Sequence, residues 1–398
     1  MFTGTAAAGH IQPLLDERTR ANRQFFDREA ARLAQVCHLM AERFARGGRL
    51  VAVGRSPAAR SDARHVAVEF VHPVIVGKRA LPALGLAGEG GNLSAQVGLV
   101  GRPDDIVIGF EADDPEVAGA LRVARDRGCL TLAFAAGSGA EHEFLPPSPD
   151  PSVRQELVET LYHVLWELVH VFFEHRGLLS GRHERTHHNA GASSFLYPFL
   201  DERENELQPV LDDVARSVLM KSEEVGALRA QTLGENDAVL RRAGGALREC
   251  FARGGQLLAL GNGGSATDAM DAVADFRATA GRWQARAAID LTEDAGIITA
   301  IANDIGVEAI FLRQVIAYGS AGDALLALST SGNSANVIAA LDQARRRGLV
   351  TVAMVGYDGG RIASEALADH VVVTRSEHIP RIQEAQASAY HVLRELVG

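Results

Sequence analysis

The chain has 398 residues, of which 47% are hydrophobic and 23% charged, with no low-complexity tract. This composition is that of an ordinary globular protein, and the length predicts two domains rather than one compact core. The formal net charge of -10 argues against a general nucleic-acid-binding or anionic-membrane surface, because either would require a basic footprint.

The cysteines, and the lack of a recognisable secretion signal or membrane span, lead us to expect a cytoplasmic protein. Residues 1–20 lack a basic stretch followed by an apolar core, so they do not resemble a secretion signal. The most apolar expected helix, residues 157–173, carries two Glu and two His side chains and is therefore expected to be buried in protein rather than to span a membrane. Three scattered cysteines form no metal-binding pattern, which fits a reducing compartment: Cys37, Cys129 and Cys250.

Internal repetition organises the chain. Three pairs of segments match in the same order: 44–54 with 251–261, 124–133 with 344–353, and 162–165 with 390–393. The first pair has the form of a helix end followed by a strand, and the second that of a helix, a glycine stop and a buried strand. Three ordered matches predict a tandem duplication of one fold.

Each copy alternates short Val, Leu, Ala and Ile runs with amphipathic helical stretches, which is typical of a parallel sheet covered by helices on both faces. We therefore expect an α/β fold with two tandem domains, each a parallel five-stranded sheet flanked by helices in a flavodoxin-like three-layer sandwich. The expected boundaries are a first domain at 1–185, a linker at 186–202 and a second domain at 203–398. In the second copy the expected strands are 256–260, 286–290, 324–328, 350–355 and 370–374, between a helical pair at 203–253 and a last helix from 381.

A polar stretch rich in His, Ser and Gly, residues 182–195, separates the two copies. Its histidines are His183, His187 and His188. A solvated connector explains them more simply than a metal site, which is the alternative.

Two small-residue turns indicate a site for a phosphate group. Each follows a short apolar run and leads into a helical pattern: residues 261–265 (Gly-Asn-Gly-Gly-Ser) and 329–334 (Ser-Thr-Ser-Gly-Asn-Ser). Glycines let the backbone approach an anion, hydroxyls and amide N–H groups donate to its oxygens, and a helix N-terminus adds partial positive charge. Neither turn has the spacing of a nucleotide-binding loop, so a phosphorylated small molecule is favoured over a nucleotide.

Three further segments accompany these turns: residues 299–304 (Thr-Ala-Ile-Ala-Asn-Asp), 356–360 (Gly-Tyr-Asp-Gly-Gly) and 380–384 (Pro-Arg-Ile-Gln-Glu). In all of these segments the second half is similar to a sugar isomerase (SIS) domain of the phosphoheptose isomerase family. The resemblance implies that the hydroxyl-rich turn binds a sugar phosphate and that no nucleotide cofactor is used. The alternative is that these residues only cap helices, although four hydroxyls at one helix start exceed what capping requires. The substrate-binding residues implied are Asn262, Gly263, Ser265, Ser329, Thr330, Ser331, Ser334 and Gln383.

Exchange between a ketose and an aldose phosphate needs a base to move a proton and an acid or metal to polarise the carbonyl. Members of the family that the second half resembles have His and Glu four residues apart on the helix after the glycine turn, and Gln and His eight residues apart on the last helix. The resemblance implies that these four hold zinc or another divalent metal, and that the Glu and the last His are acid/base groups. In the second half the positions are Asp271, Asp275, Gln383 and His391, so Asp275 and His391 are the catalytic candidates and the imidazole ligand is lost at position 271.

The first half departs in the complementary way. It carries the full set of metal-ligand types as His65, Glu69, Gln155 and His163, so Glu69 and His163 form a second catalytic candidate pair. Both of its turns differ from those of the second half. The glycine turn is replaced by residues 54–60, where Pro57 lacks a backbone N–H donor, and the serine turn by the acidic residues 109–115, whose carboxylates would repel a phosphate. The alternative is that its ionisable residues are remnants of a decayed copy.

The family builds its sites at subunit interfaces, which implies that a fused pair reproduces a dimer within one chain. We therefore expect first-half residues to complete or flank the second-half site, and a homodimer to give a four-domain assembly. The favoured function is isomerisation of sedoheptulose 7-phosphate to a heptose 7-phosphate, with no direct nucleic-acid or membrane partner. The alternative is a non-catalytic phosphosugar-binding regulator, including one associated with a replication initiator.

Overall fold

The computed structural model describes residues 11–74, 78–87, 92–174, 179, 206–279 and 283–398. The described chain forms two compact units. The N-terminal unit is residues 20–224, and the C-terminal unit is residues 225–398 together with the segment before residue 20. The predicted linker at 186–202 and the histidines at 183, 187 and 188 lie outside the described residues, so the predicted domain boundaries stay a prediction.

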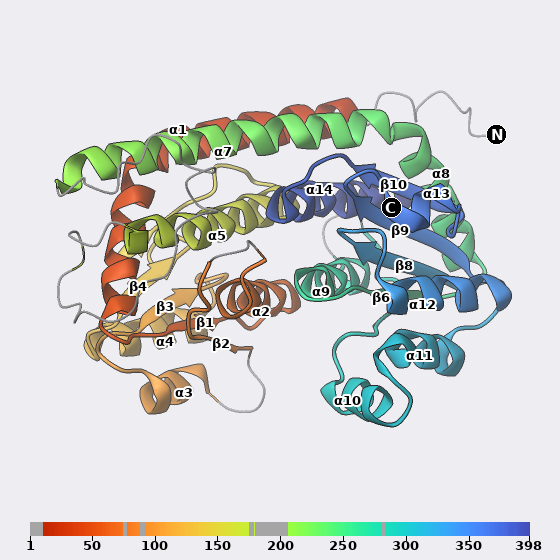
Figure 1. Cartoon of the computed structure of the whole chain (residues 1–398), viewed down its shortest axis with the longest axis horizontal. Helices are drawn as coiled ribbons and strands as arrows, with labels where there is room; N and C mark the ends of the chain where they lie inside the picture. The colour runs from red at the N-terminus through yellow and green to blue at the C-terminus, as the bar shows by residue number, and fades with distance from the viewer. Residues whose placement is uncertain (1–10, 75–77, 88–91, 175–178, 180–205, 280–282) are drawn as a thin grey trace. The chain divides into compact units, whose positions relative to one another are not determined.

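The N-terminal unit contains a five-stranded sheet in which every neighbouring pair is parallel (Figure 1). Its strand order is β2-β1-β3-β4-β5, the doubly wound order of flavodoxin-like folds. The strands are β1 (Leu50–Val53), β2 (Ala83–Leu86), β3 (Ile106–Gly109), β4 (Leu130–Ala133) and β5 (His142–Glu143).

Helices cover both faces of this sheet because alternate strand residues point to opposite sides. Leu50 and Ala52 of β1 pack in one cluster with α1, α2 and α5, whereas Val51 and Val53 pack in another with α3 and α4. The helices are α1 (Ile11–Ala45), α2 (Pro57–Val71), α3 (Leu93–Val100), α4 (Pro115–Asp126) and α5 (Pro151–Glu174).

The C-terminal unit repeats this architecture. Its strand order β10-β9-β8-β6-β7 is the same doubly wound order, again all parallel. The five expected strands are confirmed as β6 (Leu257–Leu260), β7 (Ala288–Asp290), β8 (Ala324–Ser329), β9 (Val350–Gly356) and β10 (His370–Thr374). The fold class predicted from the sequence is therefore confirmed.

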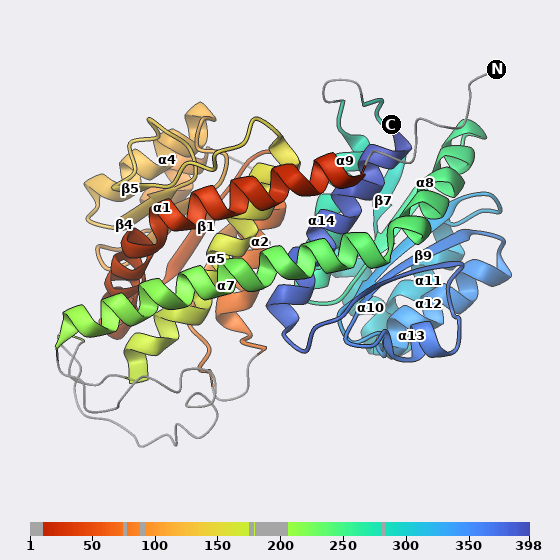
Figure 2. The ribbon, with the colours of Figure 1, turned by 90° about the horizontal axis from the view of Figure 1, so that it is seen from above.

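The helices of the C-terminal unit also form two layers. Residues of α8, α9 and α14 share one core cluster with the sheet, and residues of α11, α12 and α13 share another. Figure 2 shows α11, α12 and α13 gathered beside β9. The helices are α8 (Asp237–Ala252), α9 (Gly264–Arg277), α10 (Ala295–Asp304), η1 (Val307–Ala309), α11 (Ile310–Tyr318), α12 (Ala335–Arg346), α13 (Gly360–Ser364) and α14 (Ile379–Val397). A further helix, α7 (Leu207–Glu235), begins in the N-terminal unit and ends in the C-terminal unit.

The repeated Phe-Ala-Arg-Gly-Gly segment has the same structural role in both units. Gly47 after α1 and Gly254 after α8 have φ of 90° and 80°, the left-handed conformation that ends a helix. A Cβ on the next glycine would lie 2.0 Å from the Asp104 carbonyl oxygen at Gly48, and 2.9 Å from that of Gly322 at Gly255. Both glycines of the pair are therefore required, which explains why this segment recurs.

The helix expected at 157–173 is α5, and it is buried along almost its whole length, as predicted. Among the described residues, no helix combines the length and the apolar character needed to cross a membrane. The three cysteines are free and buried.

Candidate functional site

The glycine turn lies between β6 and α9 at the carboxyl edge of the second sheet. A Cβ at Gly261 would lie 2.2 Å from the Ser265 carbonyl oxygen, so the turn can close only with glycine there. Gly263 has φ of 58° and occupies the N-cap of α9. Because Gly263 has no side chain, the N-cap residue of α9 provides no side-chain acceptor for the first amides of the helix, of which Ala266 N–H donates to the Gly263 carbonyl oxygen at 3.0 Å.

The serine turn lies between β8 and α12, next to the glycine turn because β6 and β8 are neighbouring strands. Gly332 has φ of 62°, and a Cβ there would lie 2.2 Å from the Gly359 carbonyl oxygen. This close approach folds the turn so that the Oγ atoms of Ser329 and Ser334 lie 3.3 Å apart. Ser334 is the N-cap of α12, yet within this described turn its side chain makes no capping hydrogen bond.

An amide pair joins the two turns. Asn262 Nδ2 donates to Asn336 Oδ1 at 3.0 Å, and Asn336 Nδ2 donates back to Asn262 Oδ1 at 2.9 Å. Asn336 is buried on α12 and Asn262 is exposed. Sequence reasoning gave Asn336 no role, because only the sheet order brings positions 262 and 336 together.

The predicted substrate-binding residues thus converge at one edge of the C-terminal sheet, except Gln383, which is buried on α14. Ser265 and Ser329 are buried, whereas Thr330, Ser331 and Ser334 are half-buried and Asn262 and Gly263 are exposed. Partly exposed hydroxyls beside two helix N-termini can bind an anion from solvent.

The matching turns of the N-terminal unit are filled by the protein's own groups. Ser56 accepts from the Ala59 amide and so caps α2, and Asp114 accepts from the Glu116 and Val117 amides and so caps α4. Arg55 lies 3.3 Å from the Asp114 carboxylate. The sequence predicted that acidic residues here would repel a phosphate; the structure adds that a carboxylate already occupies the helix N-terminus.

A histidine flanked by two carboxylates lies in the C-terminal unit. His391 Nε2 of α14 is 3.4 Å from Asp271 Oδ2 and 3.4 Å from Asp275 Oδ2, both on α9. His391 and Asp271 are buried, and Asp275 is partly exposed. The spacing of four residues places both carboxylates on one face of α9, as predicted. Gln383 lies two turns earlier on α14, and its part in this group stays a prediction.

Tyr390 belongs to the same group and was missed by sequence reasoning. Its hydroxyl donates to Asp271 Oδ2 at 2.7 Å. The available signal was the Tyr-His pair that recurs in both copies, as Tyr162-His163 and Tyr390-His391.

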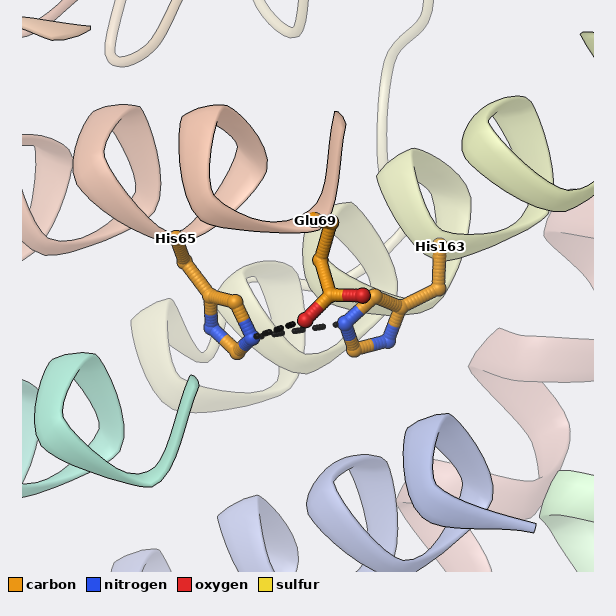
Figure 3. A group of neighbouring side chains, drawn as sticks. All are labelled: His65, Glu69 and His163. Atoms are coloured by element: carbon orange, nitrogen blue, oxygen red, sulfur yellow. Dashed lines mark hydrogen bonds and ion pairs between the residues drawn. The ribbon is translucent and has the colours of Figure 1, made fainter. Parts of the chain in front are cut away.

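The N-terminal unit contains a compact group of side chains of the kinds that bind metal ions: His65 and Glu69 on α2, and His163 on α5 (Figure 3). One ligand atom from each lies within 4.8 Å of the others. His65 Nε2 is 3.4 Å from His163 Nε2 and 3.8 Å from Glu69 Oε1. Burial lowers the pKa of His65 well below its usual value, and the neighbouring His163 lowers it further. A neutral imidazole is the metal-binding form.

The structure brings together three of the four predicted ligands in this unit. Gln155 is half-buried on α5, eight residues before His163, and its part in a metal site stays a prediction. Two imidazoles and a carboxylate whose ligand atoms are this close fit the ligand set and distances of zinc.

The doubly wound sheet, the two anion-type turns and the carboxylate-histidine group after the glycine turn define a sugar isomerase (SIS) domain. A family model for the SIS domain matches residues 222–356. The phosphoheptose isomerase of Desulfovibrio desulfuricans is 42% identical over 189 residues, which cover 47% of this chain and 89% of that protein. That of Chlorobaculum tepidum is 47% identical over 156 residues, covering 38% of this chain and 73% of that protein.

The chain belongs to the phosphoheptose isomerase family and is an isomerase. Among solved structures, it is similar in fold to the C-terminal domain of glucosamine-fructose-6-phosphate aminotransferase from Francisella tularensis, with a TM-score of 0.62 and 9% identity. That similarity covers 100% of this chain and 97% of the other, so both copies have a counterpart in fold.

Proposed function

We propose that the C-terminal unit binds a sugar phosphate at its two turns and interconverts the ketose and aldose forms. The observation that carries this proposal is the contrast between the two copies. The N-terminal unit caps α2 and α4 through the side chains of their N-cap residues, whereas in the described turns of the C-terminal unit the N-cap residues of α9 and α12, Gly263 and Ser334, make no such hydrogen bond. In the second copy no N-cap side chain therefore competes with a ligand's phosphate oxygens at these two helix N-termini, and the Val337 amide of α12 donates to Asn336 Oδ1.

His391 and Asp275 are the groups that we assign to proton transfer. Isomerisation removes a proton from the hydroxyl-bearing carbon beside the carbonyl and returns one to the former carbonyl carbon. Their separation of 3.4 Å lets one side chain exchange a proton with the other between the two steps. The family relationship supports this reaction class.

Sedoheptulose 7-phosphate is the proposed substrate, with a heptose 7-phosphate as product, because relatives carry the name phosphoheptose isomerase. Incubation in deuterated water tests this directly. We expect deuterium to enter the substrate at the carbon beside the carbonyl, with formation of the aldose measured by NMR. Binding without exchange would instead support a phosphosugar-binding regulator, an alternative favoured by the loss of imidazole at Asp271. Neither binding nor exchange would refute both.

We also predict a divalent metal, most simply zinc, at His65, Glu69 and His163. When bound, such an ion supplies charge that polarises an oxygen or fixes the protein fold. Elemental analysis of the purified full chain is expected to find about one zinc per chain, since three such residues form one tetrahedral site. His65→Ala should remove most of that metal. His72→Ala, at an exposed histidine after α2, should not, and equal loss from both variants would contradict the assignment.

A homodimer, which would give four domains, remains our prediction for the assembly. Light scattering coupled to size-exclusion chromatography would measure the mass in solution, and we expect twice the chain mass of 42.4 kDa. A mass equal to that of one chain would contradict it.

A further inference from the structure

A buried chain of polar groups extends from Tyr390 to Asp275 in the C-terminal unit. The Tyr390 hydroxyl donates to Asp271 Oδ2 at 2.7 Å, and the same oxygen faces His391 Nε2 at 3.4 Å. His391 in turn faces Asp275 at 3.4 Å. Tyr390 and Asp271 are each 2% exposed and His391 is 0% exposed, so solvent does not compete for these contacts.

We infer that Tyr390 is a positioning residue for the isomerisation: its hydroxyl fixes the Asp271 carboxylate, and that carboxylate holds the His391 ring in the orientation used for proton transfer. This inference rests on the proposed function. It assigns no contact between Tyr390 and the substrate.

The packing of the Tyr390 ring restricts the position of its hydroxyl. Its ring packs against the His391 ring with centroids 4.6 Å apart, so its hydroxyl moves little beyond rotation about the C–O bond. A hydrogen bond to a carboxylate is stronger than one between neutral groups, and in a buried site it is strengthened further. A carboxylate that orients a histidine is a recurrent arrangement in proteins, and here Asp271 faces Nε2, the same ring nitrogen that faces Asp275.

The N-terminal unit provides an internal comparison. There the position that matches Asp271 is His65, and the residue that matches Tyr390 is Tyr162, whose ring centroid is 5.3 Å from that of His65. In both copies the tyrosine ring thus packs against the ring of the following histidine, with centroids 5.0 Å apart for Tyr162 and 4.6 Å apart for Tyr390. The role inferred for the Tyr390 hydroxyl requires the carboxylate that accepts its hydrogen bond, which is Asp271.

A double-mutant cycle tests this dependence. The full chain, Tyr390→Phe, Asp271→Ala and the double variant would be compared for kcat, KM and thermal unfolding. We expect Tyr390→Phe to lower kcat about ten- to a hundred-fold, the size expected for loss of a hydrogen bond to a charged group, with KM nearly unchanged. In the Asp271→Ala background the same change should alter kcat less than about two-fold, because interacting residues are not additive. Tyr318→Phe, at a half-exposed tyrosine on α11, is the control for removal of a hydroxyl elsewhere.

Several outcomes separate this inference from the proposed function. An unchanged kcat in Tyr390→Phe, or an equal fall in both backgrounds, would overturn the positioning role while leaving the isomerase intact. A rise in KM with kcat unchanged would also overturn it, since the hydroxyl would then serve substrate binding. If the unmodified chain fails to turn over the sugar phosphate, the proposed function fails first. In that case, thermal unfolding of the four proteins would still detect the Tyr390–Asp271 hydrogen bond, because the two substitutions would change the stability non-additively.

Discussion

Replacement of Ser334 by aspartate is expected to weaken sugar phosphate binding strongly while it stabilises the fold. Ser334 and Asp114 occupy the same N-cap position of matching helices, but only Asp114 caps its helix. A carboxylate at position 334 would accept from the α12 amides, and N-cap substitutions change stability by about 0.5–2 kcal/mol. The melting temperature should therefore rise by a few degrees, roughly the shift that 1 kcal/mol produces in a domain of this size.

The same carboxylate would occupy the place of the phosphate and repel it. Two like charges about 4 Å apart near a protein surface interact by about 4 kcal/mol, so affinity should fall by a factor on the order of 100 or more. Calorimetric titration with sedoheptulose 7-phosphate and a thermal melt of the same protein would measure both effects. Ser320→Asp, in the exposed turn before β8 at the opposite edge of the sheet, adds the same charge and should leave binding unchanged. Unaltered affinity in Ser334→Asp would place the phosphate elsewhere.

Replacement of His391 by asparagine is expected to remove most turnover and little binding. His391 is fully buried between Asp271 and Asp275, so it is the group that can exchange protons with either carboxylate. Loss of a positioned acid or base typically lowers the rate about 10²- to 10⁴-fold. Asparagine keeps a hydrogen-bond donor for the carboxylates, which limits the structural damage.

Two further substitutions interpret that result. His72→Asn changes an exposed histidine after α2 and should leave kcat unchanged. His163→Asn tests the predicted catalytic part of Glu69 and His163: a comparable fall in kcat would support it, whereas loss of metal with full turnover would restrict these residues to metal binding. If His391→Asn itself keeps normal kcat, proton transfer has been assigned to the wrong histidine.

The sequence by itself determined the architecture and the position of the turns. Strand runs such as β8 and β9 are predictable because continuous burial selects apolar residues over short, glycine-bounded lengths. The glycines of the Phe-Ala-Arg-Gly-Gly repeat are required by backbone conformation, which depends on neighbours in the chain. The four-residue spacing of Asp271 and Asp275 likewise fixes a helix face before any tertiary contact is known.

Only the tertiary structure decided which polar groups meet. Tyr390 and Asp271 are 119 positions apart, and His65 and His163 are 98 apart, so their contacts follow from the packing of the last helix of each copy against the helix after its first turn. The self-capped turns of the first copy likewise required a structure, because a sequence gives the charge of Asp114 but not the direction of its side chain. Hydrogen bonds depend on tenths of an ångström and on side-chain torsions, whereas the periodic burial that encodes a fold tolerates much larger variation.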